Sequence, residues 1–166
     1  MTKISKRHFL KGKEIQKLMD EISKNTKIQM RNILGRKPKI ELINFDETRI
    51  FIVESKALFA FYKKSWIPTL IFEEALNLMP KIIVDMGAVP HVCNGADIMA
   101  PGIVEVEGNF QEGDLVTILD EKYKKFIAVG VALKGSEEMV RTKRGKVVKN
   151  IHFVGDKLWK FIKSLR

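Results

Sequence analysis

The sequence predicts an α+β protein: an N-terminal helix and a small antiparallel sheet, followed by a small barrel-like β sheet with short helices. Three observations lead to this prediction. Apolar residues recur at helical spacing in residues 11–24, they alternate in short runs from Lys39 onward, and many short apolar runs with glycine corners follow Pro80. The change of pattern near Met79 predicts two domains, residues 1–79 and residues 80–166, the second ending in a helix.

The N-terminal part is predicted as one helix and a meander. Its helix carries one apolar stripe at i, i+3, i+4 and i+7, formed by Ile15, Leu18, Met19 and Ile22. Four β-rich runs follow, broken by polar turns: KIELI, RIFIVE, ALFAFY and the segment around Trp66–Phe72. Glu73–Met79 is predicted as a short helical turn, which ends because a residue before a proline, here Pro80, avoids the helical conformation.

The C-terminal part begins with a strand, a short helix and a corner. Lys81–Asp85 predicts a short strand, and Ala88–Asn94 predicts a turn or two of helix. Gly95 then stands at the position after a helix that favours a left-handed backbone. DIM and IVEVE predict two short strands, or one strand with a sharp corner at Pro101–Gly102.

The last elements are three strands and two helices. LVTILD, FIAVGVAL and KVVKNIHFV predict the strands, and Gly130 in the second indicates a bulge or a bend. Ser136 is expected to cap a short helix that ends near Gly145, because acidic residues follow it and complement the helix dipole. DKLWKFIKSLR predicts the terminal helix.

Composition narrows the function classes. Thirty Lys and Arg against twenty Asp and Glu give a net charge of +10, which favours a polyanionic partner because phosphate binding releases counterions. A generally basic proteome would give the same charge. The longest apolar runs fall far short of the ~20 residues of a membrane span. With no secretory signal and a single cysteine, we expect a cytoplasmic protein that has no membrane association.

The stretch PHVCNGADIMAPG, residues 90–102, holds the residue types of an active site. His91 and Cys93 are two residues apart, however, and on a short helix such side chains diverge. The apolar surroundings suit Cys93 as a small buried thiol. The chain also lacks the metal-binding and nucleotide-binding motifs that would predict a cofactor. We therefore expect neither catalysis nor a cofactor.

The two glycines of this stretch and a downstream basic cluster allow a second interpretation. Gly95 and Gly102 are turn formers, and they also permit close approach of a foreign backbone. The cluster RTKRGK, residues 141–146, followed by Lys149, is a suitable cradle for phosphates. A solvated loop would have the same composition, so both interpretations stay open.

Several motifs resemble a PUA domain, an RNA-binding module. They are IIVDMGAVPHVCNGADIMAPGIV, EGDLVTIL, FIAVGVAL and GKVVKNIHFVGDKLW. GADIMAPGI and VKNIHFVGDKLW are similar to the malignant T-cell-amplified sequence and translation-machinery-associated family, which pairs an N-terminal pre-PUA domain with a PUA domain. The resemblance implies a PUA-like pseudobarrel in the C-terminal part and an α+β pre-PUA domain before it.

The resemblance also implies an RNA surface on the first helix of the PUA domain, the loop after it and the last strand. With the basic cluster added, the expected RNA-binding residues are Val89, His91, Val92, Asn94, Gly95, Ala96, Pro101, Gly102, Arg141, Lys143, Arg144, Lys146 and Lys149.

The resemblance implies a stand-alone RNA-binding protein acting in translation initiation or ribosome recycling. The expected partners are RNA (tRNA, at its acceptor end, or rRNA), the ribosomal small subunit and a protein with an initiation-factor-like domain. Phe59, Phe61 or Trp66 on the meander could contact that protein, although core packing is the favoured role for each. Two alternatives stay open: an accessory subunit of an RNA-modification enzyme, of pseudouridine synthase or transglycosylase type, and a protein-interaction scaffold with incidental charge.

Overall fold

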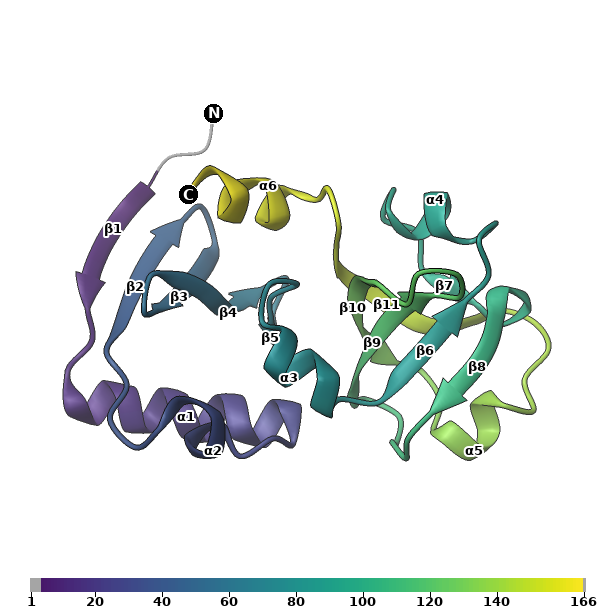
Figure 1. The fold of residues 1–166 in the computed structure, drawn as a ribbon, viewed down its shortest axis with the longest axis horizontal. Helices are drawn as coiled ribbons and strands as arrows, with labels where there is room; N and C mark the ends of the chain where they lie inside the picture. The colour runs from purple at the N-terminus through teal and green to yellow at the C-terminus, as the bar shows by residue number, and fades with distance from the viewer. Residues whose placement is uncertain (1–3, 166) are drawn as a thin grey trace. The chain divides into compact units, whose positions relative to one another are not determined.

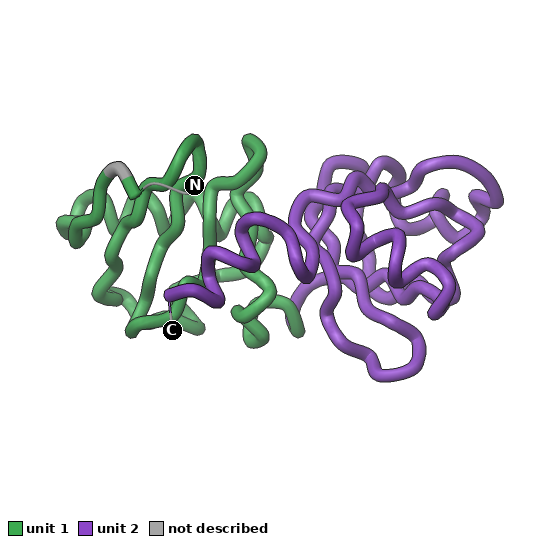
Figure 2. The backbone as a smooth tube through the Cα atoms, turned by 90° about the horizontal axis from the view of Figure 1, so that it is seen from above, with its two compact units in different colours: residues 1–77 green, residues 78–166 purple. Residues whose placement is uncertain are grey.

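The computed structural model describes residues 4–165, which fold as α+β (Figure 1). The chain divides into two compact units, residues 1–77 and residues 78–166 (Figure 2). None of the helices in the described part of the chain is long and apolar enough to cross a membrane.

The first unit is built on a five-stranded antiparallel sheet in the order β1-β2-β3-β4-β5. Its strands are β1 (Ile4–Phe9), β2 (Ile40–Phe45), β3 (Thr48–Val53), β4 (Lys56–Tyr62) and β5 (Ser65–Pro68). Its helices are α1 (Gly12–Thr26), α2 (Met30–Leu34) and α3 (Glu73–Leu78), the last reaching the boundary between the units. Every neighbouring pair of strands is consecutive in sequence, so the predicted meander is confirmed.

Helix α1 lies along one face of this sheet, as Figure 1 shows. Leu18, Met19 and Ile22 of the predicted stripe are buried. They belong to a core that burial of apolar surface stabilises by about 25 cal/mol per Å². Strand β1 was not predicted, because it is an edge strand whose side chains are mostly exposed and therefore lack the alternation of a half-buried strand.

The aromatic residues of the meander differ in exposure. Phe59 is 0% exposed, and its ring stacks on Phe51, so the suggestion that Phe59 contacts a partner is wrong. Phe61 and Trp66 are half-buried, with ring centroids 5.0 Å apart. The Arg49 guanidinium lies 4.5 Å from the Phe61 ring centroid and 5.1 Å from that of Trp66, a cation–π arrangement.

The second unit is built on a curled six-stranded sheet in the order β7-β11-β10-β9-β6-β8. Its strands are β6 (Lys81–Val84), β7 (Ile98–Met99), β8 (Ile103–Glu107), β9 (Leu115–Asp120), β10 (Phe126–Ala132) and β11 (Lys146–Phe153). Its helices are α4 (Val89–Val92), the 3-10 turn η1 (Ala100–Gly102), α5 (Ser136–Met139) and α6 (Lys157–Ser164). β6 and β9 are parallel and the other pairs antiparallel, which gives the predicted PUA-like pseudobarrel.

Helix α5 departs from the sequence prediction. Gly135, not Ser136, is its N-cap, and the helix ends at Met139 instead of near Gly145. The Ser136 hydroxyl accepts a hydrogen bond from the Phe110 N–H at 3.2 Å, and its own proton is directed to the Phe110 carbonyl at 3.3 Å. A partner from the loop before β9 therefore replaces the local cap, an outcome that local sequence cannot reveal.

Helix α6 begins at a buried carboxylate. Asp156 is its N-cap, and the carboxylate accepts hydrogen bonds from the backbone N–H groups of Trp159 and Phe153. His152 Nδ1 lies 2.9 Å from Asp156 Oδ2, and its imidazole is fully buried. Burial alone raises the pKa of Asp156. The hydrogen bond and charge of His152, together with the two backbone donors, outweigh burial and hold the pKa of Asp156 below its ordinary value.

The substitution Asp156→Asn should lower the free energy of unfolding by about 1–2 kcal/mol at neutral pH, because Asn still caps the helix but loses the charge-assisted bonds. Since the folded pKa of Asp156 is depressed, the carboxylate stabilises the fold above its unfolded pKa near 3.9. This contribution disappears as the pH falls through the lower folded pKa. Urea unfolding across the acid range checks this, and a difference that stays constant down to pH ~2 would contradict it.

Candidate nucleic-acid interface

A pocket of about 270 Å³ opens between α4 and the β7–η1 corner. Its lining is mostly apolar and consists of Ala88, His91, Val92, Ala96, Asp97, Ile98, Met99 and Gly102. The volume lies just below the ~300–1,000 Å³ that small-molecule sites typically have. The pocket is therefore of a size for one small planar group, such as a nucleobase.

One wall of the pocket is helix α4, which the preceding loop holds in place. The Asp85 carboxylate accepts a hydrogen bond from the Ala88 N–H at 2.8 Å, so the loop turns directly into the helix. The Asp85 N–H donates to the Gly102 carbonyl at 2.9 Å and ties the same loop to the η1 corner. Val92 is 2% exposed and anchors α4 in the core.

The residues after α4 are held by Asn150 of β11. Its side-chain amide donates to the carbonyls of Val92 at 3.0 Å and Ala96 at 2.9 Å. Its backbone N–H donates to the Asp97 carboxylate at 3.0 Å. Asn150 thus fixes both ends of the segment that leaves α4 and enters β7. The sequence prediction missed it, although an amide within an apolar strand is a signal, because a buried amide must find partners.

The two glycines of the site are close to the chain's own side chains. Gly95 has a φ of +94°, and a Cβ added there would lie 3.2 Å from the Phe153 ring. A Cβ on Gly102 would lie 3.2 Å from the Ala88 Cβ. Their missing side chains therefore serve packing of α4 and η1 within the unit, and the surface open to a ligand is the pocket that Gly102 lines.

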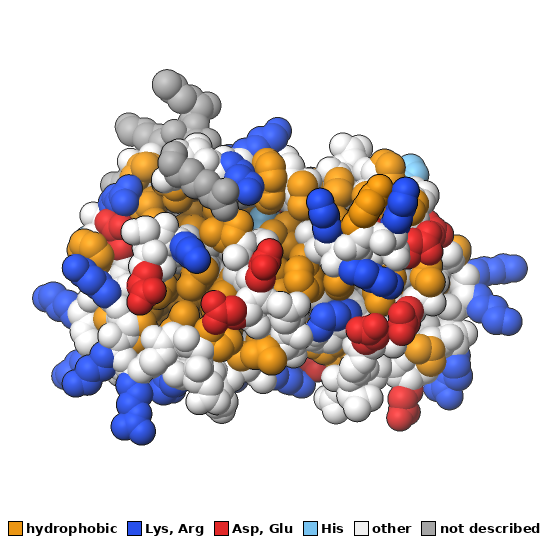
Figure 3. All heavy atoms as spheres, viewed as in Figure 1, with side chains coloured by type: hydrophobic (Ala, Val, Ile, Leu, Met, Phe, Trp, Pro, Cys, Tyr) orange, Lys and Arg blue, Asp and Glu red, His pale blue; other side chains and the backbone are white. Residues whose placement is uncertain are grey.

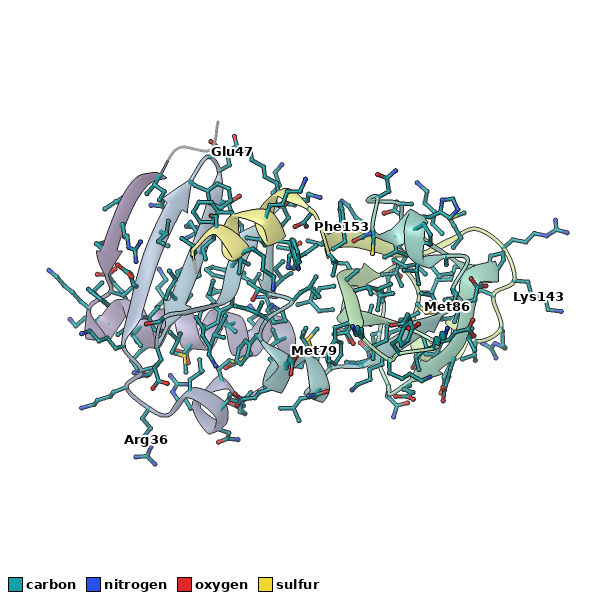
Figure 4. The ribbon with its side chains drawn as sticks, turned by 45° about the horizontal axis from the view of Figure 1, so that its top comes forward. Arg36, Glu47, Met79, Met86, Lys143 and Phe153 are labelled. Carbon is teal, nitrogen blue, oxygen red and sulfur yellow. The ribbon has the colours of Figure 1, made fainter. Side chains whose placement is uncertain are left out.

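A basic loop, residues 140–145, leads from α5 to β11 and ends at the pocket. Arg141, Lys143 and Arg144 are exposed, and Figure 4 shows Lys143 extending away from the unit. The Gly145 carbonyl at the end of the loop accepts a hydrogen bond from the Ala100 N–H of η1 at 2.9 Å. Lys146, the next residue, places its ammonium 3.3 Å from the Asp97 carboxylate of the pocket lining.

The thirteen expected RNA-binding residues divide into three groups. The pocket lining contains His91, Val92, Ala96 and Gly102. Beside the pocket, on α4, η1 or the loop between α4 and β7, lie Val89, Asn94, Gly95 and Pro101. The cations of the basic loop and β11 are Arg141, Lys143, Arg144, Lys146 and Lys149. The prediction did not include the other lining residues, Ala88, Asp97, Ile98 and Met99.

The environment of Cys93 supports its interpretation as a structural residue. Cys93 is half-buried and packs against the hydrophobic core of the second unit. Burial raises the pKa of its thiol, which disfavours the thiolate that a nucleophile requires.

Charge alone does not single out a site on the molecule. Figure 3 shows Lys and Arg side chains spread over the face in view, with Asp and Glu side chains among them. The geometry around the pocket is more specific, because the Gly145–Ala100 hydrogen bond holds a cationic loop next to the lining residue Met99 of an apolar cavity.

Comparison with known proteins places both units in families. Residues 80–154 match the PUA domain, and residues 6–73 match a domain of unknown function, DUF1947. The chain is 30% identical over 137 residues to translation machinery-associated protein 20 of Saccharomyces cerevisiae, covering 78% of this chain and 76% of the yeast protein. The chain belongs to the translation machinery-associated protein 20 family.

Two further proteins are similar to the chain over nearly its whole length. An uncharacterized protein of Methanocaldococcus jannaschii is 39% identical over 160 residues, covering 95% of this chain and 98% of that protein. The crystal structure of a PUA-domain protein from Aeropyrum pernix, a tartrate complex, superposes with a TM-score of 0.85 at 26% identity, covering 99% of this chain and 94% of that one. The family fold therefore extends over both units.

One further similarity is confined to part of the chain. The protein of Pyrobaculum aerophilum named "Probable tRNA pseudouridine synthase B" is 44% identical over 77 residues, which is 46% of this chain but 23% of the synthase.

Proposed function

We propose that this translation machinery-associated protein 20 family member binds RNA without catalysis, with an unpaired base in the α4 pocket and the adjoining phosphates on the basic loop. The observation that carries the proposal is the hydrogen bond between Gly145 and Ala100, which ties a loop of exposed cations to the η1 turn, directly after the pocket-lining residue Met99. Apolar cavities hold unstacked bases, and cations neutralise phosphates, so one short RNA segment meets both needs.

The lining of the pocket suits a base. Met99 is 45% exposed at the rim, and its flexible thioether side chain adapts to a planar group. His91 is exposed on α4 and supplies a ring nitrogen for a hydrogen bond to a base edge. Ala96 leaves room for ribose because its side chain is small.

The proposal extends to the RNA and the step of translation. The RNA is the acceptor end of tRNA or ribosomal RNA on the small subunit, and the step is initiation or ribosome recycling in the cytoplasm. The name of the yeast relative supports an association with translation. The two predicted domains divide the tasks: residues 80–166 hold RNA, and residues 1–79 dock a protein with an initiation-factor-like domain through the half-buried Phe61 and Trp66.

Replacing Arg141, Lys143 and Arg144 together by Gln should weaken binding of tRNA about tenfold or more at roughly 0.15 M salt. Each phosphate contact to a single strand contributes about −0.7 to the slope of log affinity against log salt, so three lost contacts should reduce that slope by about 2. Fluorescence anisotropy with labelled tRNA over a salt series measures both quantities.

A matched control removes three exposed lysines from α1, by Lys13→Gln, Lys17→Gln and Lys24→Gln. It changes the net charge equally and should leave the slope nearly unchanged. Equal salt slopes for the wild type and the loop variant would remove the basic loop from the site.

Ala96→Trp, which fills the pocket from an exposed position, should weaken binding of tRNA with an intact 3′ end.

A second candidate function is an accessory role in RNA modification, which the partial similarity to the pseudouridine synthase favours. The similarity covers only 23% of that enzyme, so it supports a shared RNA-binding module more than shared catalysis. Incubating tRNA with a tRNA pseudouridine synthase, with and without the full chain, and analysing the nucleosides by mass spectrometry separates the two. We expect the chain to bind tRNA without changing the extent of modification, and an increase in converted bases would favour the second candidate.

A further inference from the structure

The connection between β9 and β10, residues 121–125, places an aromatic ring among lysines in open solvent. Tyr123 is 61% exposed. The Lys122 ammonium lies 5.1 Å and the Lys125 ammonium 6.0 Å from its ring centroid, and Lys124 is also exposed. A ring so exposed contributes little to packing of the fold. Exposed aromatics flanked by cations are typical of surfaces that bind single-stranded nucleic acid.

The backbone of this connection is fixed although its side chains are exposed. The Asp120 carboxylate, whose residue is 3% exposed, accepts hydrogen bonds from the backbone N–H groups of Tyr123 and Lys125. Burial alone raises the pKa of Asp120, but these backbone donors outweigh it and hold the pKa below its ordinary value. The carboxylate therefore stays ionised and keeps the turn closed. The turn therefore holds the Tyr123 ring in solvent.

The connection is attached to the loop that leads into α4. β6 and β9 are parallel, so both end at the same edge of the sheet, and Figure 1 shows α4 beyond the end of β6. The Glu121 N–H donates to the Val84 carbonyl at 2.9 Å, and the Glu121 carboxylate accepts from the Met86 N–H at 3.1 Å. The same loop continues to Ala88 of the pocket lining.

The pocket thus has cations attached to both of its walls. The basic loop joins the η1 side through Gly145, and the β9–β10 connection joins the α4 side through Met86. A strand of RNA that places one base in the pocket has phosphates on either side of that base.

We propose that the β9–β10 connection is a second RNA contact, in which an unpaired base several nucleotides along the strand from the one in the pocket stacks on Tyr123 and its phosphates lie on Lys122, Lys124 and Lys125. This inference rests on the proposed function. It predicts that the bound RNA extends beyond the pocket. Affinity at the second contact comes from ring stacking and charge, so it does not depend on the base sequence.

The test compares two single-stranded RNAs of the same 3′ sequence, about four and about twelve nucleotides long. Tyr123→Ala in the full chain should weaken binding of the longer RNA about five- to hundredfold and leave the shorter one unchanged. Tyr123→Phe should bind as the wild type does, because it keeps the stacking face. Thermal unfolding should be the same for all three proteins, since the ring is exposed.

The outcomes distinguish this inference from the proposed function. If Tyr123→Ala binds the longer RNA like the wild type while Ala96→Trp weakens it, the second contact is wrong and the proposed function stands. If the wild type binds neither RNA with salt-dependent affinity, both are wrong. Equal loss for both RNA lengths in Tyr123→Ala would also overturn the inference, because it would place the ring within the pocket site.

Discussion

Gly130→Ala should lower the free energy of unfolding of the second unit by about 3 kcal/mol. Gly130 lies in β10 where the register with β11 shifts, between Val129 and Gly130. A Cβ built there would lie 2.5 Å from the Val148 side chain and 2.6 Å from the Lys149 carbonyl. The carbonyl belongs to a paired strand and cannot move alone, so a single methyl group displaces the whole of β11.

Urea unfolding followed by circular dichroism measures this effect. Gly87→Ala is the matched control, because it adds the same methyl group in the same unit where the nearest atom lies at an ordinary distance of 3.4 Å. We expect the control to change stability by less than about 0.5 kcal/mol. Similar midpoints for the two variants would show that β11 adjusts to the added methyl group.

Asn150→Asp should also destabilise the second unit by about 3 kcal/mol, although the two side chains have almost the same shape. The amide of Asn150 donates to the carbonyls of Val92 and Ala96, and a carboxylate would present oxygen to both. Asn150 is 7% exposed, so solvent does not relieve the repulsion. The segment between α4 and β7 should detach from β11, and RNA affinity should fall together with stability if the pocket is the binding site.

Asn109→Asp is the control, since Asn109 is exposed in the loop before β9 and undergoes the same chemical change. Stability and RNA affinity are measured for both variants at pH 7 and at pH ~4. Protonation restores a donor to the buried aspartic acid, so the penalty at position 150 should shrink as the pH falls. A penalty independent of pH would attribute the loss to packing rather than to the two hydrogen bonds.

The sequence predicted the elements whose signal is local. The stripe of α1 and the runs of the meander follow from periodicity, and the position of Gly95 follows from its freedom at positive φ. Ser136 was assigned wrongly because its partner, Phe110, is distant in sequence. The exposed edge strand β1 has no periodic signal, so it could not be found from pattern alone.

The segments that form the site were predictable from the sequence, but the residues that line the pocket were not. The α4 segment and the basic cluster follow from the family resemblance and from charge, whereas the pocket depends on how α4, η1 and β11 meet. Asn150 forms hydrogen bonds with residues that lie at least 53 positions away in the sequence. Met99 becomes a lining residue only because β7 pairs with β11. Such roles arise from tertiary contacts that one sequence does not display.

The strand order of the two sheets has a consequence for synthesis of the protein. The first sheet joins strands that follow one another in the chain, and its hairpins from β2 to β5 can each close soon after they are made. The second sheet pairs β7 with β11, which a ribosome completes much later than α4. Until β11 emerges, the α4 segment lacks Asn150 to hold it. A nascent chain therefore exposes an unfinished pocket from the synthesis of α4 until that of β11, and the binding surface forms only once β11 has been made.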